Sequence, residues 1–186
     1  MKLLLSQREI VIPDTMGIKM HLDAVERSWY SFFKNHDVTV FPNVVDIPET
    51  LDFDCLVLTG GPDSLARHRT ENALFQFAFD RDLPIVGICH GAFAVNDLTG
   101  GINGRIIGHE SCFHSVIINQ QEYNVNSHHV QNIQSLGADM IPIAVDLDGN
   151  IEAFQHQTRC IYGIVWHPER MTCPVLTPDV KELLNL

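Results

Sequence analysis

The first hundred residues alternate between short runs with an apolar centre and longer segments with helical spacing. Short apolar runs predict strands buried on both faces, as in a parallel sheet. The expected strands are residues 2–6, 38–41, 55–59 and 85–88. Apolar residues three and four positions apart predict helices with one buried face. The expected helices are residues 22–33, 69–81 and 92–98, with a loop around Pro13 and Gly17 before the first helix.

The pattern changes after Gly101, where short strands follow one another without helices between them. The expected strands are residues 106–109, 112–118, 122–125, 140–146, 151–155 and 160–166. Asp148-Gly149-Asn150 is a hairpin turn signal, and residues 178–186 predict a closing helix. Alternating strands and helices followed by strands predict an α/β fold: a mostly parallel central sheet with helices on both faces and an antiparallel extension. We expect a single domain over residues 1–186.

A glycine-flanked cysteine lies where the strand at 85–88 meets the following helix. Gly87, Cys89 and Gly91 form G-x-C-x-G, the nucleophile-elbow pattern with cysteine in place of serine. Side chains two residues before and after the cysteine would collide in so sharp a turn, which explains the glycines. A helix N-terminus also favours thiolate over thiol. Taken alone, the pattern fits a small buried cysteine in an ordinary turn equally well.

Two more loops carry chemistry at strand ends. Thr59-Gly60-Gly61-Pro62 can direct backbone N–H groups into a crevice, although it could also be a plain turn. Trp166-His167-Pro168-Glu169 places a histidine two residues before a carboxylate. A histidine can take a thiol proton, and a carboxylate can fix its tautomer. The loop and the backbone N–H of His90 would supply the oxyanion donors. By itself, His167 would be interpreted as an ordinary surface histidine.

Composition excludes several classes of protein. The net charge of −11 argues against a nucleic-acid partner, and no apolar run is long enough to cross a bilayer. Five cysteines, an odd number without C-x-x-C spacing, favour a reducing, cytoplasmic location over a disulfide framework. The ten histidines show no H-x-H or H-E-x-x-H spacing. His128 and His129 adjoin, but neighbours on a strand point to opposite faces, so no metal site is expected.

Together the motifs resemble class I glutamine amidotransferase domains, the family with a cysteine-histidine-glutamate triad. Residues 58–62 (LTGGP), 84–89 (PIVGIC) and 166–169 (WHPE) match its three signatures, and the likeness covers nearly the whole chain. The resemblance implies a flavodoxin-like three-layer fold. It also implies Cys89 as nucleophile, His167 as base, Glu169 as its orienting partner, and the Gly61 and His90 N–H groups as oxyanion hole. No metal or organic cofactor is required.

The residues expected to bind the substrate match the family less consistently than the expected triad does. Residues 125–131 (VNSHHVQ) resemble the VNSxHxQ stretch of free-standing γ-glutamyl hydrolases. The substrate-binding residues implied by the resemblance are Gly60, Ser127, His128, Phe93, Gln7 and Arg8. Ser127 and His128 could instead form a turn with a locally bonded hydroxyl, and Arg8 could be a solvated loop residue. At Phe93 the family usually has glutamine, and a phenyl ring cannot hydrogen-bond a substrate's amino-acid end.

We therefore expect a cysteine hydrolase that cleaves a small-molecule γ-glutamyl amide through a glutamyl thioester and releases glutamate. One alternative is a glutaminase subunit that passes ammonia to a separate synthetase. Another is a binding module that is catalytically silent because Phe93 blocks the amino-acid site. The leaving group and a homo-oligomeric state stay open at this point.

Overall fold

A single mixed sheet forms the centre of the computed structural model, which describes residues 1–44 and 46–186. In this described part, eleven strands join in one sheet with the order β4-β1-β5-β6-β13-β12-β11-β8-β9, and β10 links β12 to β7. The parallel strands are β4 (Asp37–Phe41), β1 (Lys2–Ser6), β5 (Cys55–Leu58), β6 (Ile85–Ile88) and β13 (Ile161–Ile164). The antiparallel extension consists of β12 (Ile151–His156), β11 (Met140–Asp146), β8 (Cys112–Ile118), β9 (Gln121–Ser127), β10 (Gln131–Ser135) and β7 (Ile102–Arg105). The expected α/β class is confirmed.

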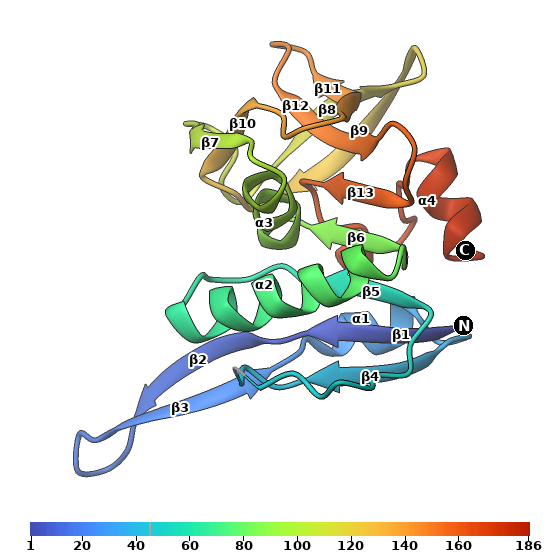
Figure 1. Cartoon of the computed structure of the whole chain (residues 1–186). Coiled ribbons are helices and arrows are strands. Elements are labelled where there is room, and N and C mark those ends of the chain that lie inside the picture. Colours follow the sequence, from blue (N-terminus) through green and yellow to red (C-terminus); the bar gives the residue numbers. More distant parts are fainter. Residues whose placement is uncertain (45) are drawn as a thin grey trace.

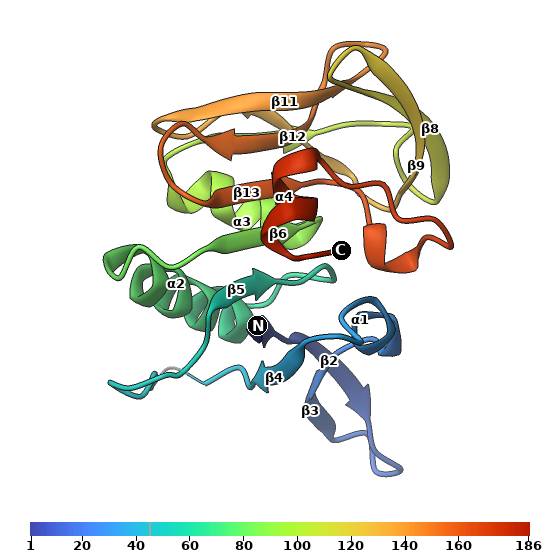
Figure 2. The same ribbon diagram turned by 90° about the vertical axis from the view of Figure 1, so that its right-hand side faces the viewer.

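Helices cover both faces of the parallel strands (Figures 1 and 2). The helices are α1 (Arg27–Phe32), α2 (Leu65–Asp80), α3 (His90–Leu98), the 3-10 helix η1 (Pro168–Arg170) and α4 (Pro178–Leu183). Successive strand residues point to opposite faces. Accordingly, Leu3 and Leu5 of β1 pack with α1 and α4, whereas Leu4 packs with α2 and α3. β1, β5 and β6 are therefore buried on both sides, whereas β4, at the edge of the sheet, is only partly buried.

One predicted helix is wrong at its beginning. Residues 22–24 belong to a hairpin of β2 (Arg8–Pro13) and β3 (Lys19–Ala24), which extends away from the sheet (Figure 1). Leu22 is 45% exposed, whereas Trp29 in α1 is 2% exposed. Apolar residues at 18, 20 and 22 have strand spacing, which the helical interpretation of 22–33 overlooked. The expected Pro13–Gly17 loop is the short turn at the hairpin's tip.

Other boundaries also differ. Helix α2 begins at Leu65 rather than 69, because the Ser64 hydroxyl caps it by accepting the Arg67 N–H. Residues 106–109 are not a strand, and β7 and β10 were not expected. β13 is shorter than the predicted 160–166 strand, and the last helix ends at Leu183.

The predicted hairpin turn at 148–150 exists, and the Asp146 carboxylate accepts the N–H groups of Asp148 and Asn150 there. Among the described residues, no helix is long and apolar enough to cross a membrane.

An apolar side chain of the hairpin, Leu22, is largely exposed, whereas one of α1, Trp29, is buried, so their substitutions should differ in their effect on stability. Trp29→Ala should lower the free energy of unfolding by about 3–5 kcal/mol, since it empties a buried site. Leu22→Ala should change it by less than about 0.5 kcal/mol, because the side chain is largely exposed. Urea unfolding of the two variants measures both values. Equal losses would contradict the hairpin and favour a continuous helix.

Candidate active site

Cys89 occupies a strained turn between β6 and α3. Its backbone has φ 52° and ψ −108°, a region that non-glycine residues rarely adopt. The Cys89 N–H is held by the Ile164 carbonyl of β13 at 2.8 Å. A Cβ on Gly91 would lie 2.0 Å from the Leu58 oxygen, and one on Gly87 would lie 2.4 Å from the Gly91 oxygen. Both glycines are thus required by close backbone approach, as the sequence indicated.

His167 and Glu169 follow β13 and form a buried pair. His167 Nδ1 lies 2.6 Å from Glu169 Oε1, and both side chains are about 2% exposed or less. Asn126 of β9 fixes the His167 backbone, because its Oδ1 accepts the His167 N–H at 2.8 Å and its Nδ2 donates to the His167 carbonyl at 2.9 Å. Gly60 packs against the ring, since a Cβ there would lie 2.3 Å from His167 Cε1. The ring is therefore confined on several sides.

The surroundings of His167 favour its protonated form. Burial lowers the pKa of this imidazole, but hydrogen bonding and charge from Cys89 and Glu169 outweigh burial and raise the pKa to about 9 from 6.5. A folded-state pKa above the unfolded value means that this proton stabilises the fold fully below pH 6.5. That stabilisation is lost as the pH rises through about 9. At neutral pH the His167 imidazole is therefore protonated.

A buried arginine shapes the Gly60-Gly61 loop. Arg67 of α2 is fully buried and donates to the carbonyls of Thr59, Gly60 and Pro62. Gly61 has φ +132°, a conformation that strongly favours glycine. Among the described residues, neither the Gly61 nor the His90 N–H has a hydrogen-bond acceptor. Free donors on both sides of Cys89 are what an oxyanion hole requires.

Glu71 links this loop to the residue after Cys89. Its Oε1 accepts from Arg67 Nε at 2.9 Å and from Ser6 Oγ at 2.6 Å, and its Oε2 lies 3.0 Å from His90 Nε2. Burial raises the pKa of Glu71, but the hydrogen bond to His90 and the Arg67 charge outweigh it and the pKa is lowered. Sequence reasoning missed this pair. Its signal was Arg and Glu four residues apart on one helix.

A small cavity of about 210 Å³ opens at Cys89. Gly61, His90, Phe93 and His128 line it, so five of the predicted site residues, Cys89 included, share one space. The His128 ring packs edge-on against His167, with ring centroids 5.6 Å apart. Phe93 is 3% exposed and follows Cys89 by one helical turn. The cavity wall at this point is therefore apolar, where the family usually has glutamine.

The remaining predicted substrate residues lie outside this cavity's lining. Ser127 is fully buried at the end of β9, and its hydroxyl donates to the carbonyl of His109, which is distant in the chain, so it is not the locally bonded hydroxyl of a turn. Gln7 is half-buried between β1 and β2. Arg8 reaches the loop, since a Cβ on Gly61 would lie 2.9 Å from Arg8 Cδ, and its guanidinium pairs with Glu26 at 2.7 Å. Glu26 also pairs with Arg170, directly after Glu169.

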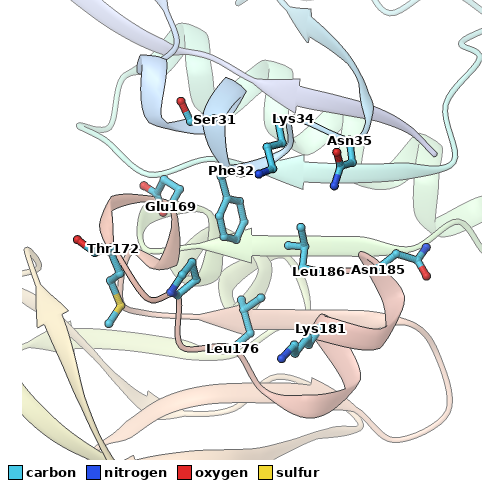
Figure 3. A pocket seen from close by; sticks show the side chains of 12 residues that line it. Ser31, Phe32, Lys34, Asn35, Glu169, Thr172, Leu176, Lys181, Asn185 and Leu186 are labelled. Carbon is cyan, nitrogen blue, oxygen red and sulfur yellow. The ribbon is translucent and has the colours of Figure 1, made fainter.

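A larger hollow of about 510 Å³ lies elsewhere, between α1 and the C-terminal segment (Figure 3). Phe32, Leu176 and Leu186 line it, and Glu169 is the member of the Cys89-His167-Glu169 group that reaches it. Cys89 does not border this hollow. Although this hollow is larger, a molecule bound in it would not contact the Cys89 sulfur. The smaller cavity is therefore the candidate site.

Comparison with known proteins agrees with this geometry. The family model for glutamine amidotransferase class-I matches residues 25–177. The chain belongs to this family. Class-I glutamine amidotransferases are enzymes, and the family assignment covers the elbow, the Gly60-Gly61 loop and the His167-Glu169 pair.

Individual relatives differ in what they do. The chain is 28% identical over 162 residues to a gamma-glutamyl-CDP-amidate hydrolase of Campylobacter jejuni, covering 76% of this chain and 78% of the relative. It is 31% identical over 144 residues to a subunit of the glutamine-hydrolyzing GMP synthase of Methanosarcina acetivorans, covering 72% and 74%. A glutamine amidotransferase from Thermotoga maritima has the same fold, with TM-score 0.68, 16% identity and coverage of 90% and 76%.

The pKa of His167 offers a direct test of the buried pair. An NMR titration of the amidotransferase should show this imidazole titrating near pH 9. Glu169→Gln should lower its pKa by about one unit or more, because the carboxylate no longer stabilises the imidazolium. Glu122→Gln, at an exposed position, is the control and should leave the value unchanged. An unshifted His167 in Glu169→Gln would rule out charge coupling between the two residues.

Proposed function

We propose that this amidotransferase-family chain is a cysteine-dependent hydrolase that cleaves a γ-glutamyl amide bond. The observation that carries the proposal is that three loops meet around Cys89. Cys89 lies on its strained turn, and Gly60 packs against the His167 ring, which pairs with Glu169. The N–H groups of Gly61 and His90, which have no acceptor among the described residues, belong to residues that line the Cys89 cavity. This is the arrangement needed for nucleophilic attack on a carbonyl with general acid-base assistance.

In the first half of the proposed reaction, the Cys89 thiolate attacks the γ-carbonyl carbon. The negative charge that develops on the carbonyl oxygen is accepted by the N–H groups of Gly61 and His90, each worth about 3 kcal/mol of transition-state stabilisation. The His167 imidazolium then donates its proton to the departing amine as the C–N bond breaks. The product is a glutamyl thioester on Cys89 and a free amine.

In the second half, neutral His167 takes a proton from a water molecule, which attacks the thioester carbonyl. The C–S bond breaks, glutamate leaves, and the thiolate-imidazolium pair is restored. Glu169 holds Nδ1 of the ring throughout, so that Nε2 faces the reacting atoms. Every step uses groups of this chain and water.

Arg8 supports binding of the amino-acid end of the substrate. Its side chain packs on Gly61, and its buried Nε has no hydrogen-bond partner among residues 1–44 and 46–186. Arg8 and Arg170 both pair with Glu26, and Arg170 Nε also lies 3.6 Å from Glu169 Oε1. Arg8 thus places a cationic donor beside the Gly61 loop. A substrate carboxylate is the complementary group.

Activity assays with a panel of γ-glutamyl amides, glutamine included, test the proposal. Wild-type protein should release glutamate from at least one of them, and Cys89→Ala should lower kcat by about a thousandfold or more, because it removes the nucleophile. Cys160→Ala, which removes an exposed free thiol, is the matched control and should retain full activity. Equal glutamate release by wild type and Cys89→Ala would exclude the mechanism, whereas no release by the wild type from any of these amides would leave a catalytically silent binding module.

Phe93 is the position from which to test substrate preference. Phe93→Gln should raise kcat/KM for glutamine relative to a γ-glutamyl conjugate by about tenfold, because an amide can hydrogen-bond the amino-acid end. Phe93→Leu keeps the wall apolar and should leave this ratio unchanged. Circular dichroism checks that both buried substitutions preserve the fold. If the two variants shift the ratio alike, Phe93 does not set the preference.

The second candidate function is delivery of ammonia to a separate synthetase, with this chain as the glutaminase. It is favoured by the relatives that are named as one subunit of a glutamine-hydrolyzing GMP synthase, since such a name implies a partner. In that case ammonia would be the amine released from Cys89's substrate, and glutamine the substrate. A glutaminase rate that rises when the synthetase is added distinguishes this function from that of a free-standing hydrolase.

A further inference from the structure

Three histidines and a glutamate gather inside the antiparallel extension, apart from the Cys89-His167 pair. The four are His109 in the β7–β8 connection, His114 on β8, His129 just after β9, and Glu152 on β12. One ligand-type atom from each lies within 4.8 Å of all the others. The side chains of His129 and Glu152 are 3% and 1% exposed, and those of His109 and His114 are 11% and 15% exposed. The group is therefore almost sealed from water.

Hydrogen bonds within the protein do not satisfy this cluster. His109 Nδ1, both ring nitrogens of His114, His129 Nε2 and Glu152 Oε2 are buried and have no hydrogen-bond partner among the described residues. Buried polar atoms without partners cost about 1–3 kcal/mol each. Five such atoms within one cluster would cost a considerable part of the stability of a chain of this size. Such a concentration of orphaned atoms calls for a binding partner that the chain itself does not provide.

The spacing of the donors fits a small cation better than a set of hydrogen bonds. Glu152 Oε1 lies 3.4 Å from His109 Nδ1, and Glu152 Oε2 lies 3.7 Å from His114 Nε2 and from His129 Nε2. Donors about 2.0–2.1 Å from a tetrahedral metal are about 3.4 Å from one another. Three imidazoles and a carboxylate are also a donor set that suits zinc and similar divalent ions.

Residues around the cluster prepare the histidines as ligands. His129 Nδ1 lies 2.7 Å from the Gln131 carbonyl and so carries the proton, which leaves the Nε2 lone pair pointing inward. His109 Nε2 lies 3.4 Å from the Asp146 carboxylate, which favours the tautomer with a free Nδ1. Metal-binding histidines commonly have such partners on the other ring nitrogen. Burial and the neighbouring His109 and His129 outweigh Glu152 and lower the pKa of His114, which favours neutral imidazole.

We propose that His109, His114, His129 and Glu152 bind one divalent cation of the zinc class in a four-coordinate, structural site. Four protein ligands complete a tetrahedral shell and leave no open position for a metal-bound water. The site is thus distinct from the reaction at Cys89. The expectation from sequence that there is no metal site rested on local spacing. It failed to anticipate this cluster because the sheet collects its members from four separate segments, and because His128 and His129 lie beyond the end of β9.

Metal binding at this place would brace the wall of the catalytic cavity. His129 lines that cavity, and its ring centroid lies 5.9 Å from that of Phe93. The same segment is tied to His109 through the Ser127 hydroxyl and through the His129 N–H, which lies 3.3 Å from the His109 carbonyl. A bound ion would add a rigid link between β8, β12 and the 127–131 segment. The inference does not rest on the proposed hydrolase activity.

The test uses full-length Cys89→Ala protein, so that the catalytic thiol cannot bind the metal. After treatment with a chelator, calorimetric titration with Zn²⁺ should show one equivalent bound per chain and a raised thermal midpoint. Adding His114→Ala or Glu152→Gln should weaken binding by more than the roughly 10–100-fold expected for loss of a supporting residue. His21→Ala, at an exposed hairpin position, is the matched control and should bind as tightly as its parent.

Cobalt substitution keeps the test decisive if a cluster variant fails to fold. Co²⁺ in the Cys89→Ala protein should give the intense visible absorption of a tetrahedral site, without the near-ultraviolet band of a thiolate ligand. Absence of Zn²⁺ and Co²⁺ binding by the folded protein would overturn the proposal. So would binding that both cluster variants leave unchanged, or a spectrum that shows octahedral or thiolate coordination.

Discussion

The buried Arg67-Glu71 pair is the interaction on which the candidate site depends. Arg67 holds the carbonyls of the Thr59-Pro62 loop, and Glu71 binds Ser6 and His90. This pair thus positions both the Thr59–Pro62 loop and His90, the residue that follows Cys89. Removing either partner would leave a buried charge unpaired, at a cost of about 3–5 kcal/mol. Helix α2 therefore positions residues of the candidate site as well as covering the sheet.

The antiparallel extension completes the site from the other side. Asn126 of β9 clamps the His167 backbone, and the following residues form the cavity wall. The extension's interior holds the His109-His114-His129-Glu152 cluster, directly behind that wall. The geometry of the candidate site is thus shared between a parallel half that positions Cys89 and an antiparallel half that confines the His167 ring and forms part of the cavity wall.

Prediction from sequence succeeded where one local pattern had one physical meaning. The strands predicted at 2–6, 55–59 and 85–88 have apolar centres because both faces of these strands are covered, and the structure agrees closely. It failed at 22–33, where apolar spacing fitted both a helix and a strand over a few residues. Substrate binding by Ser127 stays a prediction, and its hydroxyl donates to the His109 carbonyl in this structure.

The sequence by itself determined the turn at Cys89, the glycine requirements around it and the family. These features depend on neighbouring residues and on close backbone contact, which short motifs record. Only the tertiary structure decided which distant side chains meet: Arg67 with the Gly60-Gly61 loop, Asn126 with His167, and the three histidines with Glu152. The physical reason is that strand pairing brings together residues far apart in the chain, and no local spacing encodes that pairing.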